Sequence, residues 1–291
     1  MSAKTILKKS SLVFLENYLN NASPTGYESE GQKLWMDYLK PYVDTFITDT
    51  YGTAVGVINP DAPYKVVIEG HSDEISWYVN YITDNGLIYV IRNGGSDHQI
   101  APSKRVNIHT KKGIVKGVFG WPAIHTRNRG KEETARIDNL FIDLGCSTKE
   151  EVEKMGVHVG CVITYPDEFM VLNQNKFVCR AIDNRMGGFM IAEVARLLHE
   201  NKKKLPFGLY ITNSVQEEVG LRGAEMIAHK VLIYGDVNMN ILDGSAVWAA
   251  SAAEVLARAG CDVSFLLKAK PTTHRLRPCQ LFLQHHRAIP L

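Results

Sequence analysis

Hydrophobic positions in the first seventy residues follow first a helical and then a strand-like spacing. Residues 4–20 carry apolar side chains three or four positions apart, which predicts an amphipathic helix. A second helix is predicted through LWMDYLK, ending before Pro41, and Thr25 with Glu28 ahead of it has the spacing of a capping box. The runs TFITDTYGTAVGVI and YKVVIEG predict strands, joined by a turn at NPDAPY.

The spacing changes between residues 75 and 172, where the helical pattern largely disappears. Short runs typical of strands follow one another, namely ISWYVNYI, GLIYVIR, RVNIHT, GIVKGVF and CVITY. Turn signals such as Asp84-Asn85-Gly86 and Lys112-Gly113 separate them, and STKEEVEKMG predicts one short helix. This stretch therefore predicts a small β-rich domain.

Helices and strands alternate again from about residue 177. NRMGGFMIAEVARLLHE and LRGAEMIAHK predict helices, while FGLYITNSV and VLIYGDV predict strands. Such alternation predicts an α/β fold with a mostly parallel sheet and helices on both faces. We therefore expect one α/β domain built from residues 1–74 and 173–291, with the β-rich domain of residues 75–172 inserted into it.

The composition excludes several classes of protein. The 291 residues are 45% hydrophobic and 22% charged, and 33 basic against 31 acidic side chains give a net charge of +2. This balance excludes a strongly basic nucleic-acid binder, and no apolar run is long enough to span a bilayer. The N-terminal segment is expected to be a helix rather than a signal peptide. The five scattered cysteines form no CxxC pair, which indicates a reducing, cytoplasmic location.

Side chains that could perform chemistry follow four of the predicted strands. KVVIEG leads into His71-Ser72-Asp73-Glu74, and VCRAI leads into Asp183. LYITNSV leads into Gln216-Glu217-Glu218, and VLIYG leads into Asp236. Because open α/β sheets place their sites beyond the carboxyl ends of the strands, we expect these groups to lie close together.

Each of these features alone is more often a cap, a turn or a solvated loop. Together, one imidazole and several carboxylates at strand ends would repel one another without a cation. Mixed nitrogen and oxygen ligands favour zinc, cobalt or manganese over calcium. A set this rich in acids favours a pair of metal ions, which activate a water between them.

The motifs GHSDE, AIDNR and QEEVGLRGA, in this order, resemble those of the tetrahedral, or glutamyl and deblocking, aminopeptidases, peptidase family forty-two. The resemblance implies a peptidase that removes N-terminal residues from peptides with a water activated by two divalent metals, zinc or cobalt. It implies metal ligands at His71, Asp183, Glu218 and Asp236, with Asp243 as the fallback for the last. Asp183 would bridge both metals.

The resemblance also implies which group transfers the proton and which group orients the histidine ligand. Glu217 would be the general base, and Asp73, two residues beyond His71, would orient that histidine. The inserted β-rich domain is where this family carries its dimerisation domain. A homo-oligomer is therefore expected, possibly a dodecamer, with a peptide as substrate and no nucleic-acid or membrane partner.

The C-terminal part departs from this family. The family's last ligand, a histidine near the C-terminus, is not found in its usual context, and the region after Asp243 looks short or atypical. Three histidines occur there, His274, His285 and His286. Two alternatives stay open: a catalytically impaired family member that lacks the last metal ligand, and a cellulase-like glycosidase that uses two carboxylates without metal.

Overall fold

The computed structural model describes residues 7–127, 130, 133–173, 176–227, 230–234, 262–267 and 288–290. It divides into two compact units. Unit 1 comprises Met1–Leu34 and Ser72–Met186, and unit 2 comprises Trp35–His71 and Gly187–Leu291. This division differs from the domain bounds expected from the sequence, 1–74 with 173–291 and 75–172, which stay a prediction.

Unit 2 contains a four-stranded sheet in the order β1-β2-β12-β3. Its strands are β1 (Thr45–Thr48), β2 (Ala54–Ile58), β3 (Lys65–His71) and β12 (Gly208–Ser214). β3 and β12 are parallel, whereas β2 is antiparallel to both β1 and β12. The expectation of a mostly parallel sheet is therefore wrong for this sheet, which is mixed.

The reason lies in two short connections near the N-terminus. A tight turn, in which Gly52 N donates to Asp49 O at 3.2 Å, returns the chain from β1 to β2, and such hairpins make neighbouring strands antiparallel. The predicted NPDAPY turn does join β2 to β3, but β12 lies between these two strands. A separate sheet of parallel strands contains β13 (Lys230–Tyr234), β14 (Asp262–Leu267) and β15 (Ala288–Pro290).

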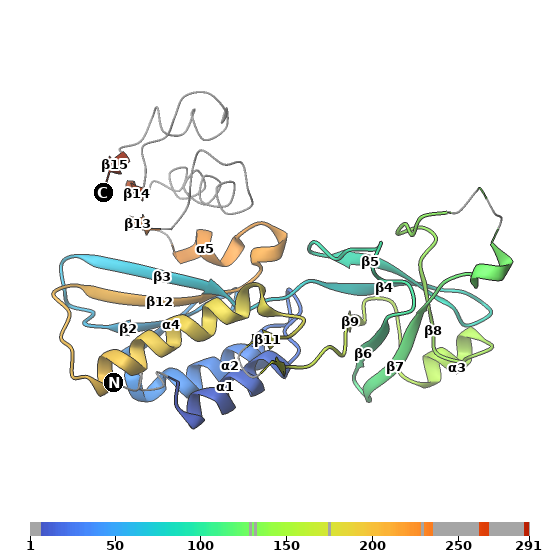
Figure 1. The fold of residues 1–291 in the computed structure, drawn as a ribbon, viewed down its shortest axis with the longest axis horizontal. Helices are drawn as coiled ribbons and strands as arrows, with labels where there is room; N and C mark the ends of the chain where they lie inside the picture. Colours follow the sequence, from blue (N-terminus) through green and yellow to red (C-terminus); the bar gives the residue numbers. More distant parts are fainter. Residues whose placement is uncertain are drawn as a thin grey trace. The chain divides into compact units, whose positions relative to one another are not determined.

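Helices flank the four-stranded sheet on both sides, with α4 (Ile182–Glu200) and α5 (Arg222–Ile227) on opposite sides in Figure 1. α4 approaches β3 closely because residue 70 is glycine: a Cβ there would lie 2.6 Å from Gly188 N. α5 is tied to the end of β12 by a bond from Gly223 N to Val215 O at 3.0 Å. The α/β class expected from the sequence is confirmed.

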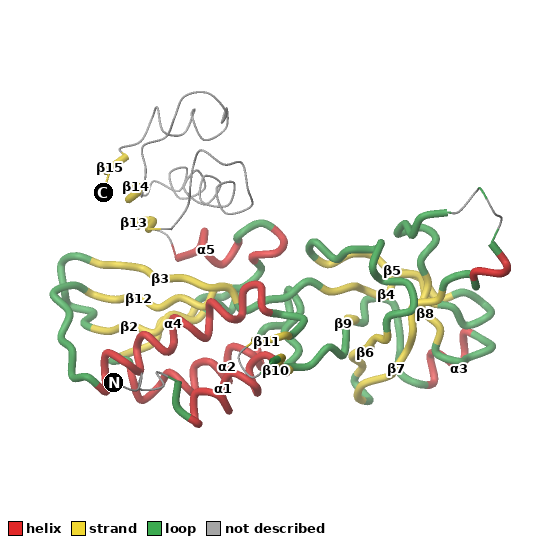
Figure 2. The backbone as a smooth tube through the Cα atoms, in the orientation of Figure 1, coloured by secondary structure: helices red, strands yellow, loops and turns green. Residues whose placement is uncertain are grey.

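Unit 1 contains a closed barrel in the order β4-β5-β8-β7-β6-β9 (Figure 2). Its strands are β4 (Ser76–Ile82), β5 (Ile88–Asn93), β6 (Arg105–Thr110), β7 (Gly113–Gly120), β8 (Phe141–Asp143) and β9 (Val162–Thr164). Closure leaves no unpaired edge. A continuous apolar core fills the barrel, and within it the Trp77 and Phe119 rings pack edge to face at 5.5 Å.

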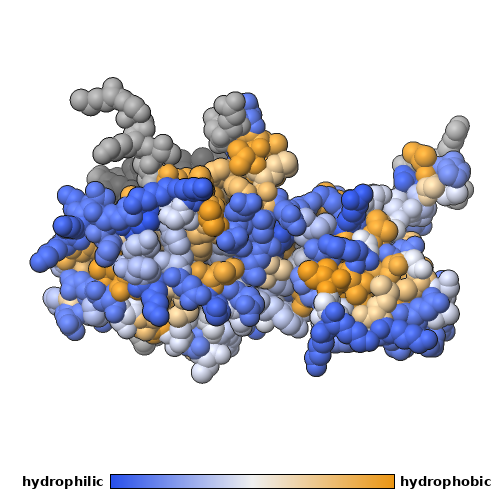
Figure 3. Space-filling view, turned by 90° about the horizontal axis from the view of Figure 1, so that it is seen from below, coloured by the Kyte–Doolittle hydropathy of each residue, from blue (hydrophilic) through white to orange (hydrophobic). Residues whose placement is uncertain are grey.

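The barrel surface is partly apolar. Figure 3 shows hydrophobic side chains gathered on the barrel, at the right of that view. Tyr81 is 53% exposed, whereas Trp77 is buried, so only some of the barrel's aromatic residues can face a partner. Among the residues that the structure describes, no helix has the length and apolarity needed to cross a membrane.

Short elements complete the described chain. The helices are α1 (Lys9–Asn20), α2 (Ser29–Leu39) and α3 (Lys149–Lys154), and β10 (Met170–Leu172) pairs with β11 (Lys176–Val178). Three 3₁₀ turns are η1 (Lys40–Tyr42), η2 (Ile124–Thr126) and η3 (Glu217–Val219).

The capping box predicted ahead of α2 is wrong. α2 begins at Ser29, so Glu28 and not Thr25 precedes its first residue. The Glu28 carboxylate accepts from Gly26 N at 2.9 Å, and the Thr25 hydroxyl donates to Asp73 Oδ2 at 2.8 Å. The spacing of Thr25 and Glu28 is typical of a helix start, but the Thr25 side chain instead contacts a residue 48 positions away.

Candidate active site

The carboxyl ends of β3 and β12 lie side by side in unit 2. These strands are paired in parallel, and their register places Ser214 opposite His71. His71, the last residue of β3, is 6% exposed. The sequence prediction that side chains after these two strands would meet at one edge of the sheet is therefore confirmed for His71 and the turn after β12.

That turn aims two carboxylates at the histidine. Gln216 has a φ of +54°, and Gly220 closes the 3₁₀ turn with a φ of +117°. Two left-handed residues so close together reverse the chain within one short turn, and Glu217 and Glu218 lie between them.

His71, Glu217 and Glu218 form a cluster whose nearest ligand atoms all lie within 4.8 Å of one another. His71 Nε2 lies 3.6 Å from Glu217 Oε2. The imidazole is nearly buried, and the Glu217 side chain is 20% exposed. One imidazole nitrogen and two carboxylate oxygens are ligands of the kind that zinc and cobalt accept.

Glu69 is a further acid beside this cluster that the sequence analysis missed. Burial raises the pKa of its carboxyl to about 7, while the Ser214 hydrogen bond and His71 lower it and Glu217 raises it further. The signal was an acid at the fifth of seven strand positions in KVVIEGH, where an apolar residue is the norm for a covered sheet.

Asp73 belongs to unit 1 and is fully buried. Its carboxylate accepts the hydrogen bond from the Thr25 hydroxyl that is described above. The neighbouring Glu74 is paired with Arg180, whose Nε lies 2.8 Å from Glu74 Oε2. These contacts fix the chain immediately after β3, while the role of Asp73 toward His71 stays a prediction.

Asp183 also belongs to unit 1, at the start of α4, and is exposed. Asp183 and Asn184 have non-helical backbone angles, and the peptide bond between them is cis. Arg185, which follows, is fully buried and lies over the Tyr18 ring at 4.3 Å. The metal-bridging role of Asp183 stays a prediction. Asp236, the fallback Asp243 and the histidines at 274, 285 and 286 lie outside the described residues.

Comparison with known proteins identifies the family. The profile described as M42 glutamyl aminopeptidase matches residues 52–247, two thirds of the chain and the whole stretch that carries the predicted site. The chain belongs to the M42 glutamyl aminopeptidase family. The family expected from the three sequence motifs is thereby confirmed.

This M42 family member is also similar to individual proteins. It is 30% identical over 220 residues to the lysyl aminopeptidase of Pyrococcus furiosus, covering 75% of the chain and 62% of that protein. It resembles the crystal structure of the TET aminopeptidase from a marine sediment Thaumarchaeota archaeon with a TM-score of 0.72 and 28% identity, covering 79% of this chain and 68% of the other.

A third likeness concerns the fold alone. The dodecamer named PhTET1-12s has a TM-score of 0.69 and 21% identity, covering 99% of this chain and 90% of that one. The M42 family member spans about 60% of the length of the curated relatives that it matches.

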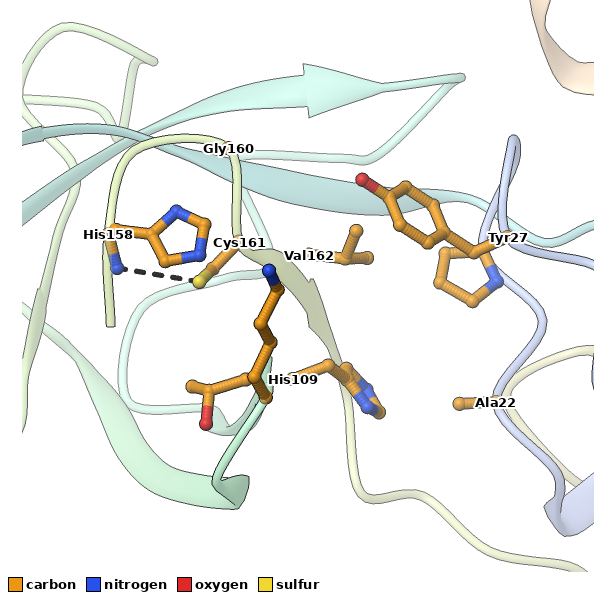
Figure 4. Close-up of a pocket in the computed structure, with 10 residues that line it drawn as sticks. Ala22, Tyr27, His109, His158, Gly160, Cys161 and Val162 are labelled. Carbon is orange, nitrogen blue, oxygen red and sulfur yellow. Dashed lines mark hydrogen bonds between the residues drawn. The ribbon is translucent and has the colours of Figure 1, made fainter. Parts of the chain in front are cut away.

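The M42 family member has a half-open cavity of about 410 Å³ in unit 1. Figure 4 shows Tyr27, His109 and His158 around it, and His158 N donating to Cys161 Sγ at 3.4 Å. Burial lowers the pKa of His109, whose Nε2 lies 2.9 Å from Thr164 Oγ1. None of the predicted site residues that the structure describes lines this cavity.

Proposed function

We propose that this chain is a metal-dependent aminopeptidase that hydrolyses N-terminal residues from peptides. The observation that carries the proposal is the cluster of His71, Glu217 and Glu218 at the carboxyl ends of two parallel strands. Family membership supports the reaction class, because the profile that matches is that of a peptidase.

The described residues fit a divalent ion. Three ligand atoms lie within 4.8 Å of one another, and one of them is an imidazole nitrogen, which suits zinc or cobalt better than calcium. His71 and Glu218 would hold metal, together with Asp183 and with Asp236. Two bound divalent ions supply Lewis acidity that lowers the pKa of a water towards neutrality.

The chain's own groups would move the proton. Glu217 lies beside the ligand His71 and is partly open to solvent, so it can accept a proton from water and return it to the leaving amine. Asp73, buried two residues beyond His71, would orient that imidazole. Replacing Glu217 should affect proton transfer, whereas replacing Asp73 should affect the orientation of His71. The two assignments can therefore be tested separately.

The family match favours a peptidase over the cellulase-like glycosidase alternative. The impaired-member alternative stays a prediction, because its decisive ligands lie outside the described residues. Metal content without turnover would support it.

We propose in addition a cytoplasmic homo-oligomer assembled through the barrel. Exposed apolar side chains on β7, Ile114 and Val118, support this, as does the similarity to the dodecamer named PhTET1-12s.

The proposal is tested by assaying the purified chain on short peptides and on a β-glucan, before and after treatment with a strong chelator. We expect N-terminal residues to be released, the chelator to abolish this, and zinc or cobalt to restore it. Glucan hydrolysis that survives chelation would instead support a glycosidase, and metal binding without hydrolysis of any peptide would identify an impaired member.

A further inference from the structure

Thr25 holds the carboxylate of Asp73 by a short hydrogen bond within unit 1. The Thr25 hydroxyl oxygen lies 2.8 Å from Asp73 Oδ2 and 3.3 Å from the Glu74 carbonyl oxygen. A hydroxyl has one proton to donate, and bonds to ionised acceptors are shorter and stronger than bonds to neutral ones. The proton is therefore donated to Asp73.

Both groups are inaccessible to water. Asp73 is 0% exposed and Thr25 is 3% exposed. A buried carboxylate depends on protein donors for its hydrogen bonds, because losing one leaves an unsatisfied charge that water cannot reach. The direction of the Thr25 hydroxyl thus bears directly on the orientation of the Asp73 carboxylate.

The backbone of Thr25 is itself fixed from both sides. Its N–H donates to the Glu74 carbonyl at 3.2 Å, and its carbonyl accepts from Asn93 Nδ2 at 2.9 Å and from the Tyr78 hydroxyl at 3.3 Å. Tyr78 and Asn93 belong to the barrel strands β4 and β5. A β-branched side chain on a fixed backbone has few rotamers, so the hydroxyl position is set by the fold.

The chain beside Thr25 is joined to the chain beside Asp73 by further bonds. Ser23 N donates to Glu74 Oε1 at 2.7 Å, and Glu74 N donates to the Ser23 carbonyl at 3.0 Å. Arg180 completes the pairing of Glu74. The segment 23–25 is therefore a rigid support for residues 73–74 and not a loose loop.

We propose that Thr25 is a positioning residue, which sets the orientation of the Asp73 carboxylate and through it the affinity of the site for divalent metal. This rests on the aminopeptidase function and on the role of Asp73 toward His71, both proposed above. Nothing in the sequence pattern assigned this role, since the spacing to Glu28 indicated a helix cap.

The test compares two substitutions of matched size. Thr25→Val keeps the branched shape and removes the hydroxyl, whereas Thr25→Ser keeps the hydroxyl and removes a methyl group. Each metal-free variant of the whole chain is titrated with cobalt, and the visible absorption of the bound ion reports its coordination independently of catalysis. We expect Thr25→Val to weaken cobalt binding by about 10–100-fold, as for other groups that orient metal ligands, and to change the spectrum, while Thr25→Ser stays close to the wild type.

A double-variant cycle separates positioning from general destabilisation. In an Asp73→Ala background, Thr25→Val should have no further effect on cobalt affinity, because the group through which it acts is gone. An equal loss in both backgrounds would overturn the proposal, and so would Thr25→Val matching Thr25→Ser in affinity and spectrum. Thr25→Ala serves as a second hydroxyl-free variant if the valine variant does not fold.

The same titration distinguishes this proposal from the function on which it rests. A wild type that binds no cobalt and hydrolyses no peptide would overturn both. A wild type that binds cobalt and hydrolyses peptides, with the valine and serine variants alike, would overturn only the role of Thr25.

Discussion

At the scale of single residues, two adjacent carboxylates share one imidazole neighbour. Glu217 and Glu218 both lie in the cluster with His71, and they occupy successive positions of one 3₁₀ turn. We propose that Glu217 transfers the proton and that Glu218 binds metal. Because these roles differ in kind, isosteric substitutions can separate them.

Glu217→Gln should lower kcat by about 10²–10⁴-fold, the usual contribution of a general base, while bound metal is retained. The matched variant Glu218→Gln should lose metal affinity together with activity. Peptide hydrolysis and elemental analysis on the same samples check this. Full activity in the Glu217 variant, or equal metal loss in both, would refute the division of roles.

Glu69 should make the metal-free chain more stable at acid pH. Its pKa is raised from the ordinary value of 4.5 to about 7 in the folded chain, so between these values the folded state binds more protons than the unfolded state. Its contribution to stability therefore falls as pH rises through that window, by at most about 3 kcal/mol. Glu69→Gln removes this contribution.

Urea unfolding of the chelator-treated protein at pH 5 and pH 8 measures this effect. The Gln variant should gain stability relative to the wild type at pH 8 and gain little or none at pH 5. A difference between the two proteins that is the same at both pH values would show that Glu69 does not titrate in this range.

Residue types and strand ends were enough to predict His71, Glu217 and Glu218 as neighbours, because the ends of parallel strands share one edge. They were not enough for Thr25, whose partner Asp73 is 48 positions away and belongs to no local motif with it. Glu69 was missed for a related reason: periodicity shows that a strand is covered, but not which groups surround a polar side chain within it.

At the scale of elements, β3 and α4 can pack closely because residue 70 of β3 is glycine and has no side chain. Gly70→Ala would place a methyl group 2.6 Å from the Gly188 nitrogen, which is backbone and cannot rotate away. The strand and the helix must then separate, at a cost of about 1–3 kcal/mol. Gly95→Ala is the control, because a Cβ there meets nothing within 4 Å.

Thermal unfolding of the two alanine variants checks this prediction. The Gly70 variant should have the lower Tm, and its cluster at His71, the next residue along β3, should bind metal more weakly. Equal Tm values for the two variants would mean that α4 can shift without cost.

The four-stranded sheet shows that strand order could not be predicted from local sequence patterns. Hydrophobic runs predicted most strands and helices, since both depend on local spacing. The order of strands depends on which partner covers each edge, and β12 enters between β2 and β3 although it follows them by about 140 residues. No local pattern carries that information, so a mixed sheet was expected to be mostly parallel.

At the scale of the whole molecule, the barrel surface bears on assembly. Ile114 and Val118 lie four positions apart on β7, so they share one face of that strand, and they are 55% and 39% exposed. Replacing both with lysine should dissociate the proposed homo-oligomer, because charged groups cannot be buried unpaired in an interface. Light scattering measures the mass.

Met190→Lys is the control for assembly, because Met190 is 61% exposed on α4 and outside the barrel. It should leave the mass of the assembly unchanged. Loss of assembly in both variants, or in neither, would contradict a barrel-based interface.

We propose that His71, Glu217 and Glu218 mark a divalent metal site that performs peptide hydrolysis. The most direct measurement is zinc per chain by elemental analysis after equilibrium dialysis, with peptide hydrolysis assayed on the same samples, for the wild type and for His71→Ala. We predict tightly bound zinc and hydrolysis in the wild type, and a loss of both in the variant. Equal zinc content in the two proteins, or hydrolysis that does not depend on zinc, would contradict the account.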